Sequence, residues 1–138
     1  MPTGTVLIGL LAAIAASACG ARASQMPQQA ERQTVWRQVG SWSGANSLQT
    51  ESFPSDTGAL RVRWETSVPA GAAATASAMF RLTAHSAISG RSLQEVVEQG
   101  GAGSGIAYIQ QDPHVFYMVV ESNRVNWKFT VEEAIGYP

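Results

Sequence analysis

One stretch decides the fold class: Leu60-Arg61-Val62-Arg63-Trp64-Glu65-Thr66. Its apolar side chains alternate with charged ones. A period of two places the apolar residues on one face of a β-strand and the charged residues on the other. Extended to residues 59–67, the stretch therefore predicts a strand with one face in the core and one face in solvent.

Further strands are predicted on both sides of this one. Residues 79–85 and 125–131 alternate in the same way, whereas residues 115–120 are continuously apolar, which is typical of a central strand buried on both faces. Weaker patterns predict strands over residues 35–39, 48–53, 92–98 and 106–111. Loops are expected over residues 40–47, 68–77 and 100–105, where Gly, Pro, Ala or Ser are frequent.

These strands predict the fold. About eight short strands, interrupted about every 8–12 residues by Gly, Pro, Asn or Ser, are the pattern of an all-β sandwich or barrel. At 138 residues the chain has room for one ordinary domain. We predict a single antiparallel β-sandwich, jelly-roll or immunoglobulin-like, over residues 35–134, with a short tail at 135–138. Trp64 and Trp127 fall on apolar faces and are expected in its core.

The N-terminal segment is predicted to be an export signal. Residues 5–16 form an uncharged, largely apolar run that is followed by small residues, as in a secretory signal peptide. The run is shorter than the roughly 20 apolar residues of a membrane-spanning helix. We therefore assign residues 1–18 to a signal peptide and residues 19–34, which are polar, to a flexible tether.

Two processing sites compete in this segment. Residues 16–19, ASAC, resemble the lipobox of bacterial lipoproteins, in which the Cys is acylated and becomes the first residue of the mature chain. The usual Leu of that motif is replaced by Ala16. Residues 21–23, ARA, fit an ordinary signal peptidase site with Ser24 as the new N-terminus, and an uncleaved anchor is the third alternative. Cys19 is the only Cys, so it is the candidate lipid attachment point and no internal disulfide forms.

Composition and motifs argue against several classes of function. The net charge is −1 and Lys and Arg are scattered singly, which does not fit a nucleic-acid partner. The glycine-rich residues 100–105 are not followed by the Lys of a phosphate-binding loop. His85 and His114 have no metal-ligand spacing. We therefore expect no metal and no cofactor.

Catalytic groups are also not expected. No G-x-S-x-G motif is present. Asp112 and His114 could supply two of the three residues of a catalytic triad, but the Asp-Pro-x sequence at this point is also typical of an ordinary turn. Glu132 and Glu133 are adjacent on a predicted strand, so they point to opposite faces and cannot act as an acid–base couple. Both are expected to face solvent or to lie at the end of the domain. The sequence predicts that the protein is not an enzyme.

Four residues are candidates for ligand binding. Trp36 and Trp42 flank the predicted loop near the start of the domain, where an exposed ring can stack on a sugar. Arg61 and Arg63 share the polar face of their strand and can contact an acidic glycan or a lipid headgroup. The alternatives are that the rings cover one end of the sandwich and that the arginines form cross-strand ion pairs.

The order of these features resembles a loose class of small bacterial exported β-sandwich modules of unassigned function. The shared plan is a G-x-x-x-G start at Gly40, a short strand ending in Phe53, the alternating strand at residues 60–64, a strand like residues 80–82, an apolar strand carrying Tyr, and a final strand like residues 127–131. The resemblance covers residues 40–133. It implies an exported or surface-anchored sandwich and provides no catalytic residues.

Two functional hypotheses follow. The first is a non-enzymatic, exported or lipid-anchored binding module of the bacterial cell envelope, with an unknown protein or glycan as partner. The alternative is a structural accessory subunit of an envelope assembly that binds no small ligand. An exposed aromatic platform with polar neighbours would favour the first, and a broad uncovered apolar face would favour the second.

Metabolic labelling with a clickable fatty acid tests the lipid site. We expect label on the full chain and none on Cys19→Ala, because acylation requires the thiol. Label on neither chain, with export of a form that begins near Ser24, would show that the ordinary peptidase site is used.

Overall fold

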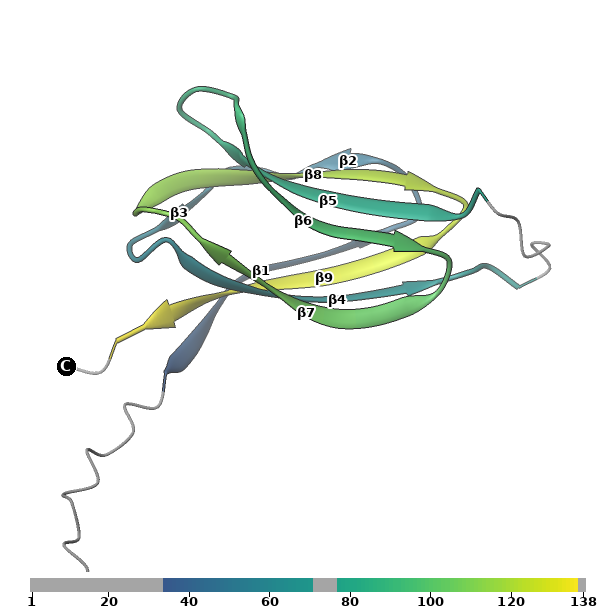
Figure 1. Cartoon of the computed structure of the whole chain (residues 1–138), viewed down its shortest axis with the longest axis horizontal. Coiled ribbons are helices and arrows are strands. Elements are labelled where there is room, and N and C mark those ends of the chain that lie inside the picture. The colour runs from purple at the N-terminus through teal and green to yellow at the C-terminus, as the bar shows by residue number, and fades with distance from the viewer. Residues whose placement is uncertain (1–33, 71–76, 137–138) are drawn as a thin grey trace, which may run out of the picture. The chain divides into compact units, whose positions relative to one another are not determined.

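The computed structural model describes residues 34–70 and 77–136, and in them the chain forms nine β-strands and no helix (Figure 1). The strands are β1 (Val35–Gly44), β2 (Leu48–Gln49), β3 (Phe53–Ser55), β4 (Ala59–Ser67), β5 (Met79–Ser86), β6 (Ser92–Gly100), β7 (Gly103–Gln110), β8 (His114–Asn123) and β9 (Asn126–Ile135). The all-β class predicted from the alternating sequence is confirmed.

The strands form two antiparallel sheets that pack face to face. Sheet A has the strand order β1-β9-β4-β7, and sheet B has the order β2-β8-β5-β6 with β3 also paired to β8. In Figure 1 sheet A lies below sheet B, and the chain passes from sheet B to sheet A between β6 and β7. This is the predicted antiparallel β-sandwich, with nine strands where about eight were expected.

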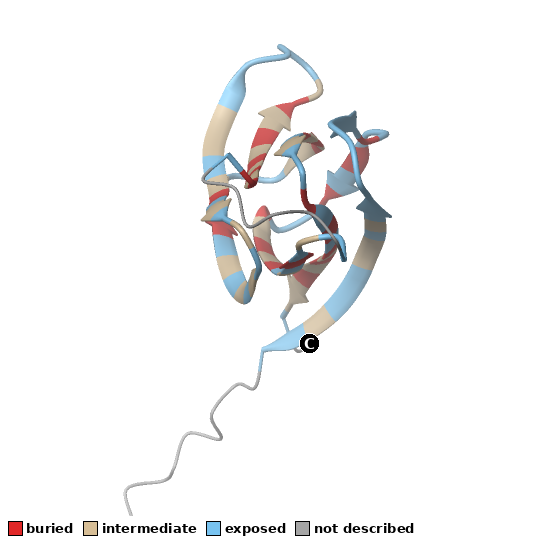
Figure 2. Ribbon diagram, turned by 90° about the vertical axis from the view of Figure 1, so that its right-hand side faces the viewer, coloured by how far each residue is buried: buried red, intermediate tan, exposed pale blue. Residues whose placement is uncertain are grey.

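The core lies between the sheets and consists of the residues whose alternation predicted it. The fully buried side chains include Leu60 and Val62 of β4, Phe80 and Leu82 of β5, and Phe129 and Val131 of β9. Trp127 is buried, and Trp64 packs against the core. Figure 2 shows buried positions alternating with exposed ones along the strands. Each such large apolar side chain contributes on the order of 2 kcal/mol by leaving water.

The first strand is longer than predicted, because much of the segment expected as a loop is strand. β1 continues to Gly44 and stays paired with β9 over its whole length. The pairing shifts by one residue between Gln38 and Gly40, which is a β-bulge at Val39. Gly40 is needed there, since a Cβ atom on it would lie 2.4 Å from the ring of Trp42. Close packing of a ring over the backbone, rather than a turn, explains this glycine.

Two other strand predictions need correction. The strand expected over residues 48–53 is divided into β2 and β3 at Thr50, whose hydroxyl accepts a hydrogen bond from the backbone N–H of Met118. The strand expected to be buried on both faces is β8, and only one of its faces is buried. Phe116, Met118 and Val120 are buried, whereas the residues between them are half-buried because they lie on the outer side of sheet B.

The expectation of a solvent-facing side chain is wrong for Glu133, whereas Glu132 does point to the outer face of sheet A. They do point to opposite faces of β9, as adjacent strand residues must. The Glu133 side chain is only 1% exposed, and that of Glu132 is 16% exposed. Glu132 pairs with Arg61 and Arg63 on the outer face of sheet A, whereas Glu133 points inward. Each carboxylate is therefore occupied by its own set of partners.

Glu133 joins three parts of the fold. Its Oε1 accepts hydrogen bonds from the backbone N–H groups of Asp56 and Thr57 at 2.6 and 3.1 Å and from the Ser55 hydroxyl at 2.9 Å. Its Oε2 accepts a hydrogen bond from Arg37 of β1 at 2.6 Å. One buried carboxylate on β9 thus holds both the turn between β3 and β4 and the start of β1.

Opposing effects act on the pKa of Glu133. Burial raises the pKa, because the charged form loses its hydration. The hydrogen bonds from Arg37, from Ser55 and from the two backbone N–H groups favour the charged form, and together they outweigh burial. The pKa of Glu133 therefore lies below its ordinary value of 4.5, and the carboxylate is ionised in the folded protein near neutral pH.

Several predictions lie outside the described residues: the signal peptide over 1–18, the lipid site at Cys19, the tether up to residue 33, and residues 71–76 of the loop after β4. Within the described parts of the chain, no helix with the length and hydropathy of a membrane span occurs.

Replacing Glu133 by Gln is expected to lower the free energy of unfolding by about 2 kcal/mol at neutral pH, because charge-assisted hydrogen bonds are lost. The pH dependence should change as well. The folded-state pKa is lowered, so the ionised carboxylate stabilises the fold above its ordinary pKa of 4.5, and this contribution disappears as pH falls through the lowered pKa. Urea unfolding of both proteins between neutral and acid pH measures the difference, which should shrink in acid.

Glu121→Gln is the matched control, since its side chain is 57% exposed and pairs with Arg81 at the surface. We expect a change below about 0.5 kcal/mol for this variant. Equal losses in the two variants would contradict the structural role of Glu133.

Candidate functional site

Three of the four predicted binding residues lie on the outer face of sheet A. Arg61 and Arg63 alternate with the buried residues of β4, so their side chains point away from sheet B. Trp36 of β1 pairs with Ala134 of β9, which is on the same face of β9 as Glu132. Strand pairing therefore brings to one surface residues that are far apart in the sequence.

This surface is arranged in rows that cross the four strands of sheet A. Neighbours in a row are about 5 Å apart, close enough for side-chain contact. In the order β1, β9, β4, β7, the first row is Gln38, Glu132, Arg61 and Tyr108; the second is Ser41, Thr130, Arg63 and Ile106; the third is Ser43, Lys128, Glu65 and Ser104. We define the outer-face cluster as Trp36, Arg61, Arg63, Tyr108 and Glu132.

Arg61 is the fixed centre of the outer-face cluster. Its Nε–H donates a hydrogen bond to Glu132 Oε2 at 2.6 Å. Its guanidinium carbon lies 4.4 Å from the centroid of the Trp36 ring, which is a cation–π contact. Only 15% of the Arg61 side chain is exposed, although it lies on an outer face. A carboxylate and an aromatic ring therefore hold this guanidinium in one position.

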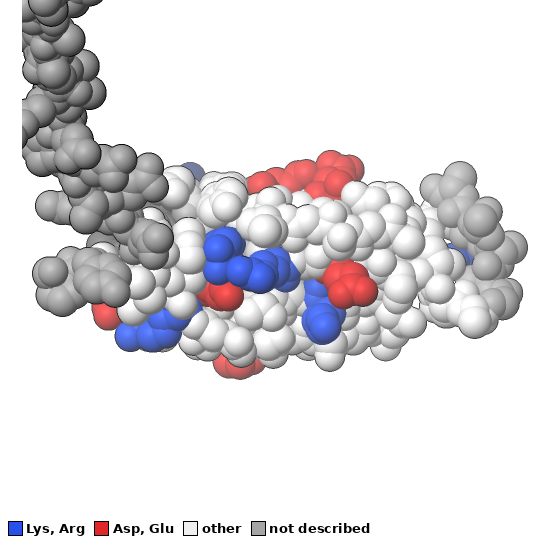
Figure 3. All heavy atoms as spheres, turned by 90° about the horizontal axis from the view of Figure 1, so that it is seen from below, with Lys and Arg blue, Asp and Glu red and all other residues white. Residues whose placement is uncertain are grey.

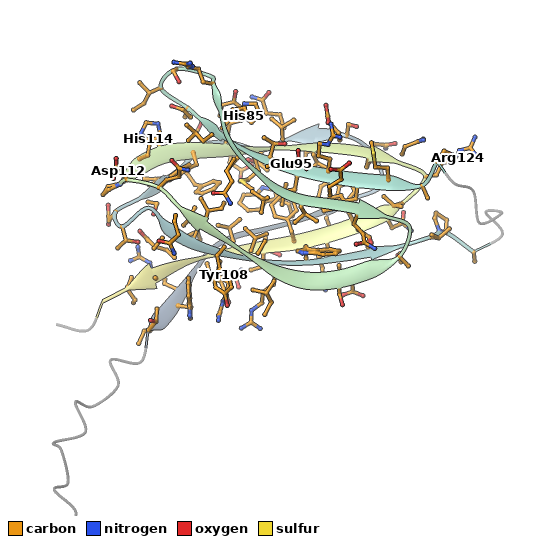
Figure 4. All side chains as sticks on the ribbon, in the orientation of Figure 1. His85, Glu95, Tyr108, Asp112, His114 and Arg124 are labelled. Atoms are coloured by element: carbon orange, nitrogen blue, oxygen red, sulfur yellow. The ribbon has the colours of Figure 1, made fainter. Side chains whose placement is uncertain are left out.

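Arg63 and Tyr108 are the open members of the cluster. Arg63 donates from Nε to the same Glu132 oxygen at 3.3 Å, and 54% of its side chain remains exposed. Tyr108 is 53% exposed, and its ring centroid lies 6.1 Å from that of Trp36. Figure 4 shows Tyr108 pointing away from the sandwich. The cluster thus presents a guanidinium and an aromatic ring to solvent.

The fourth predicted residue, Trp42, lies on the inner side of β1. Positions 36 and 42 are an even number of residues apart, so an unbroken strand would place both rings on one face. The bulge at Val39 reverses the alternation between them. The Trp42 ring stacks on Phe129 with centroids 5.2 Å apart and contacts Phe53 at 5.8 Å. The structure therefore does not bring Trp42 to the outer-face cluster.

A small residue allows Trp36 to reach Arg61. The two residues are on β1 and β4, and β9 lies between these strands. The residue of β9 that pairs with Trp36 is Ala134. Its methyl group leaves room for the indole ring to cross β9 and cover the guanidinium.

Charges of both signs alternate over the outer face of sheet A. The first three rows contain three basic and two acidic side chains. Seen from this side, Lys and Arg adjoin Asp and Glu, and uncharged surface separates these groups without a deep hollow (Figure 3). Such a surface suits a ligand that lies across the sheet better than a small molecule that must be enclosed.

The outer face of sheet B differs in both charge and aromatic exposure. Arg81 is shared between Glu98 at 3.3 Å and Glu121 at 3.4 Å. Tyr117 stacks against His85 with ring centroids 5.0 Å apart. The tyrosine of this face is therefore covered by an imidazole, whereas Tyr108 on sheet A is open.

The second histidine begins β8 and contacts the serine that fixes the turn after β5. His114 Nε2 forms a hydrogen bond with the hydroxyl of Ser86, which is 2% exposed. The same serine oxygen accepts the backbone N–H groups of Ile88 and Ser89, both at 3.2 Å, and so fixes the turn after β5. In the described part of the chain no hydrogen bond joins Asp112 to His114, so the triad considered from the sequence is not assembled.

The other sequence candidates are also accounted for. Among the residues with described positions, no three His, Cys, Asp or Glu side chains gather as metal ligands would. The expected glycine-rich loop is reduced to a tight hairpin, because β7 already starts at Gly103. Gly105 lies beneath Trp64, where a Cβ atom would be 3.0 Å from the ring. This glycine serves packing inside the sandwich.

No protein-family model matches the chain. No curated protein sequence matches it either. The role of the outer-face cluster therefore rests on its own geometry and chemistry.

Sequence reasoning missed two members of this cluster. Tyr108 belongs to a strand that is apolar on both sides in the sequence, so the pattern does not show which side is outward. Glu132 becomes recognisable only when β9 is paired with β4, because this pairing sets it opposite Arg61. The missing signal in both cases is the register between strands.

The two tryptophans are expected to differ in their contribution to stability. Trp36→Ala should lower the free energy of unfolding by about 1 kcal/mol, the usual value of a surface cation–π contact with a tilted ring pair. Trp42→Ala should lower it by about 3 kcal/mol, because its ring packs against the core. Urea unfolding measures both values. A larger loss for Trp36→Ala would be inconsistent with the positions that the bulge gives these rings.

Proposed function

We propose that this chain is a non-enzymatic binding module of the bacterial cell envelope, with the outer face of sheet A as its contact surface. Export through the N-terminal segment, with a lipid on Cys19 in the anchored form, belongs to this proposal. The observation that carries it is the outer-face cluster, in which open Arg63 and Tyr108 stand beside a fixed Arg61.

The composition of this surface supports a binding role. Aromatic residues and Arg are the side chains that most often provide the binding energy of protein surfaces. Ile106 lies next to Tyr108 on the same face of β7 and is 52% exposed, so the aromatic ring has an apolar neighbour. Because Arg61 is already held by Trp36 and Glu132, part of the surface is ordered before a ligand arrives.

The alternative of a structural subunit without a ligand fits less well. That hypothesis predicts a broad, uncovered apolar face. On both sheets the described outer surfaces carry ion pairs instead, such as Arg61 with Glu132 and Arg81 with Glu98. A non-enzymatic role is supported by Ser86, whose buried oxygen is engaged in a turn.

The location in the envelope is supported by the sequence. The apolar run at residues 5–16 is followed by the lipobox-like residues 16–19 and by a polar segment. The resemblance of residues 40–133 to exported bacterial sandwich modules points in the same direction.

Photo-crosslinking in the bacterium that encodes this chain tests the proposed surface. A benzophenone amino acid replaces Tyr108 in one version of the full chain and Tyr117 in the other, so that each sheet carries one probe on its outer face. We expect adducts in the envelope fraction from position 108 and few from position 117, because the contact surface belongs to sheet A.

The proposal fails if neither position gives adducts, or if adducts form at position 117 and not at position 108. Adducts confined to the cytoplasmic fraction would contradict the envelope location.

A further inference from the structure

Two guanidinium groups in the outer-face cluster share one carboxylate oxygen. Arg61 and Arg63 both donate from Nε to Glu132 Oε2, at 2.6 and 3.3 Å. A single negative charge cannot neutralise two positive ones, so the cluster carries an excess positive charge. Arg61 is the better paired of the two, because its bond is shorter and Trp36 covers its guanidinium. The excess charge is therefore located at Arg63.

Arg63 has capacity for another anion. A guanidinium has five N–H donors in a planar fork. Among the residues that the structure describes, Arg63 donates a side-chain hydrogen bond to Glu132, and it uses only its Nε–H for this bond. More than half of the Arg63 side chain is exposed. Its terminal N–H groups can form the bidentate contact that a carboxylate accepts.

The surroundings of Arg63 define the rest of the ligand. Tyr108, in the adjacent row, offers an open ring face. The exposed amides of Gln38 and Gln110 lie on the same outer face, paired with Glu132 and Ala59. A pyranose ring has an apolar C–H face that can pack against an aromatic ring, and a rim of hydroxyl groups that can form hydrogen bonds with amides elsewhere on the same surface.

We infer that the outer-face cluster binds a polysaccharide of carboxylated sugars, with the carboxylate on Arg63 and the sugar ring against Tyr108. This inference rests on the proposed function and names the ligand of the same surface. Arg61 acts as a positioning residue that keeps Glu132 and Trp36 in place. A chain of sugars suits the even surface of sheet A, because it can lie across several rows.

An anionic membrane surface is less favoured by the same residues. Polybasic sites for anionic lipids usually contain about 4–8 Lys or Arg without interspersed acidic groups. The three basic side chains of this face are interspersed with Glu65 and Glu132. A sugar carboxylate needs only one well-placed guanidinium, which is what Arg63 provides.

The test measures binding of the full chain to polygalacturonate, alginate and hyaluronate by calorimetry. Methyl-esterified polygalacturonate is the matched uncharged polymer, and phosphatidylglycerol vesicles are the matched anionic surface. We expect binding to at least one of the acidic polymers, and much weaker binding to the ester and to the vesicles.

Variants identify the residues involved. Arg63→Gln should weaken binding about tenfold, the usual effect of losing one charge-assisted contact. Arg91→Gln, which removes the same charge from an exposed position in the turn between β5 and β6 of sheet B, should change affinity by less than about twofold. Tyr108→Ala should weaken binding about fivefold to tenfold, as for the loss of an aromatic stacking partner, and Tyr108→Phe should retain it. Circular dichroism checks that each variant folds.

Three results would overturn the inference: no binding to any acidic polymer, equal binding to the ester or the vesicles, or equal losses for Arg63→Gln and Arg91→Gln. If adducts at position 108 persist in such a case, the contact surface stands and only the ligand class is wrong. If those adducts are also absent, the proposed function fails as well.

Discussion

The buried carboxylate of Glu133 is the interaction on which the rest of the structure depends. It accepts hydrogen bonds from the turn between β3 and β4 and from Arg37 on β1. Arg37 is the neighbour of Trp36, so the contact that fixes the start of β1 also fixes the strand that carries the indole to the outer face. A charge buried in this way is stabilising only because its partners are complete. The Glu133 carboxylate therefore links the stability of the fold to the position of the strand that carries Trp36.

The two adjacent glutamates of β9 have different roles on the two faces of sheet A. Glu133 points inward and joins strands to a turn, whereas Glu132 points outward and holds Arg61 and Arg63. Neighbouring residues on a strand necessarily face opposite ways. One of two neighbouring residues thus stabilises the fold and the other orders the surface, and the sheet keeps their side chains apart.

The outer-face cluster combines fixed and open groups. Arg61 is held between a carboxylate and an aromatic ring, so it loses little freedom when a ligand binds. Arg63 and Tyr108 keep unused donors and an unused ring face. An ordered base with open groups at its edge has the properties of a binding surface, and it differs from sheet B, where Arg81 is paired twice and Tyr117 is covered.

The sequence by itself determined the class of fold, most of the core and the outward direction of Arg61 and Arg63, because a period of two fixes which side of a strand each residue occupies. It did not determine on which face of β1 the Trp36 and Trp42 rings lie. A bulge at Val39 reverses the alternation between them, and this bulge depends on how β1 pairs with β9. It also did not show that Glu133 is buried and Glu132 lies at the surface. A strand pattern does not say which face will provide hydrogen-bond donors for a buried carboxylate. Only the tertiary structure decided these points, through the register between strands that are distant in the sequence.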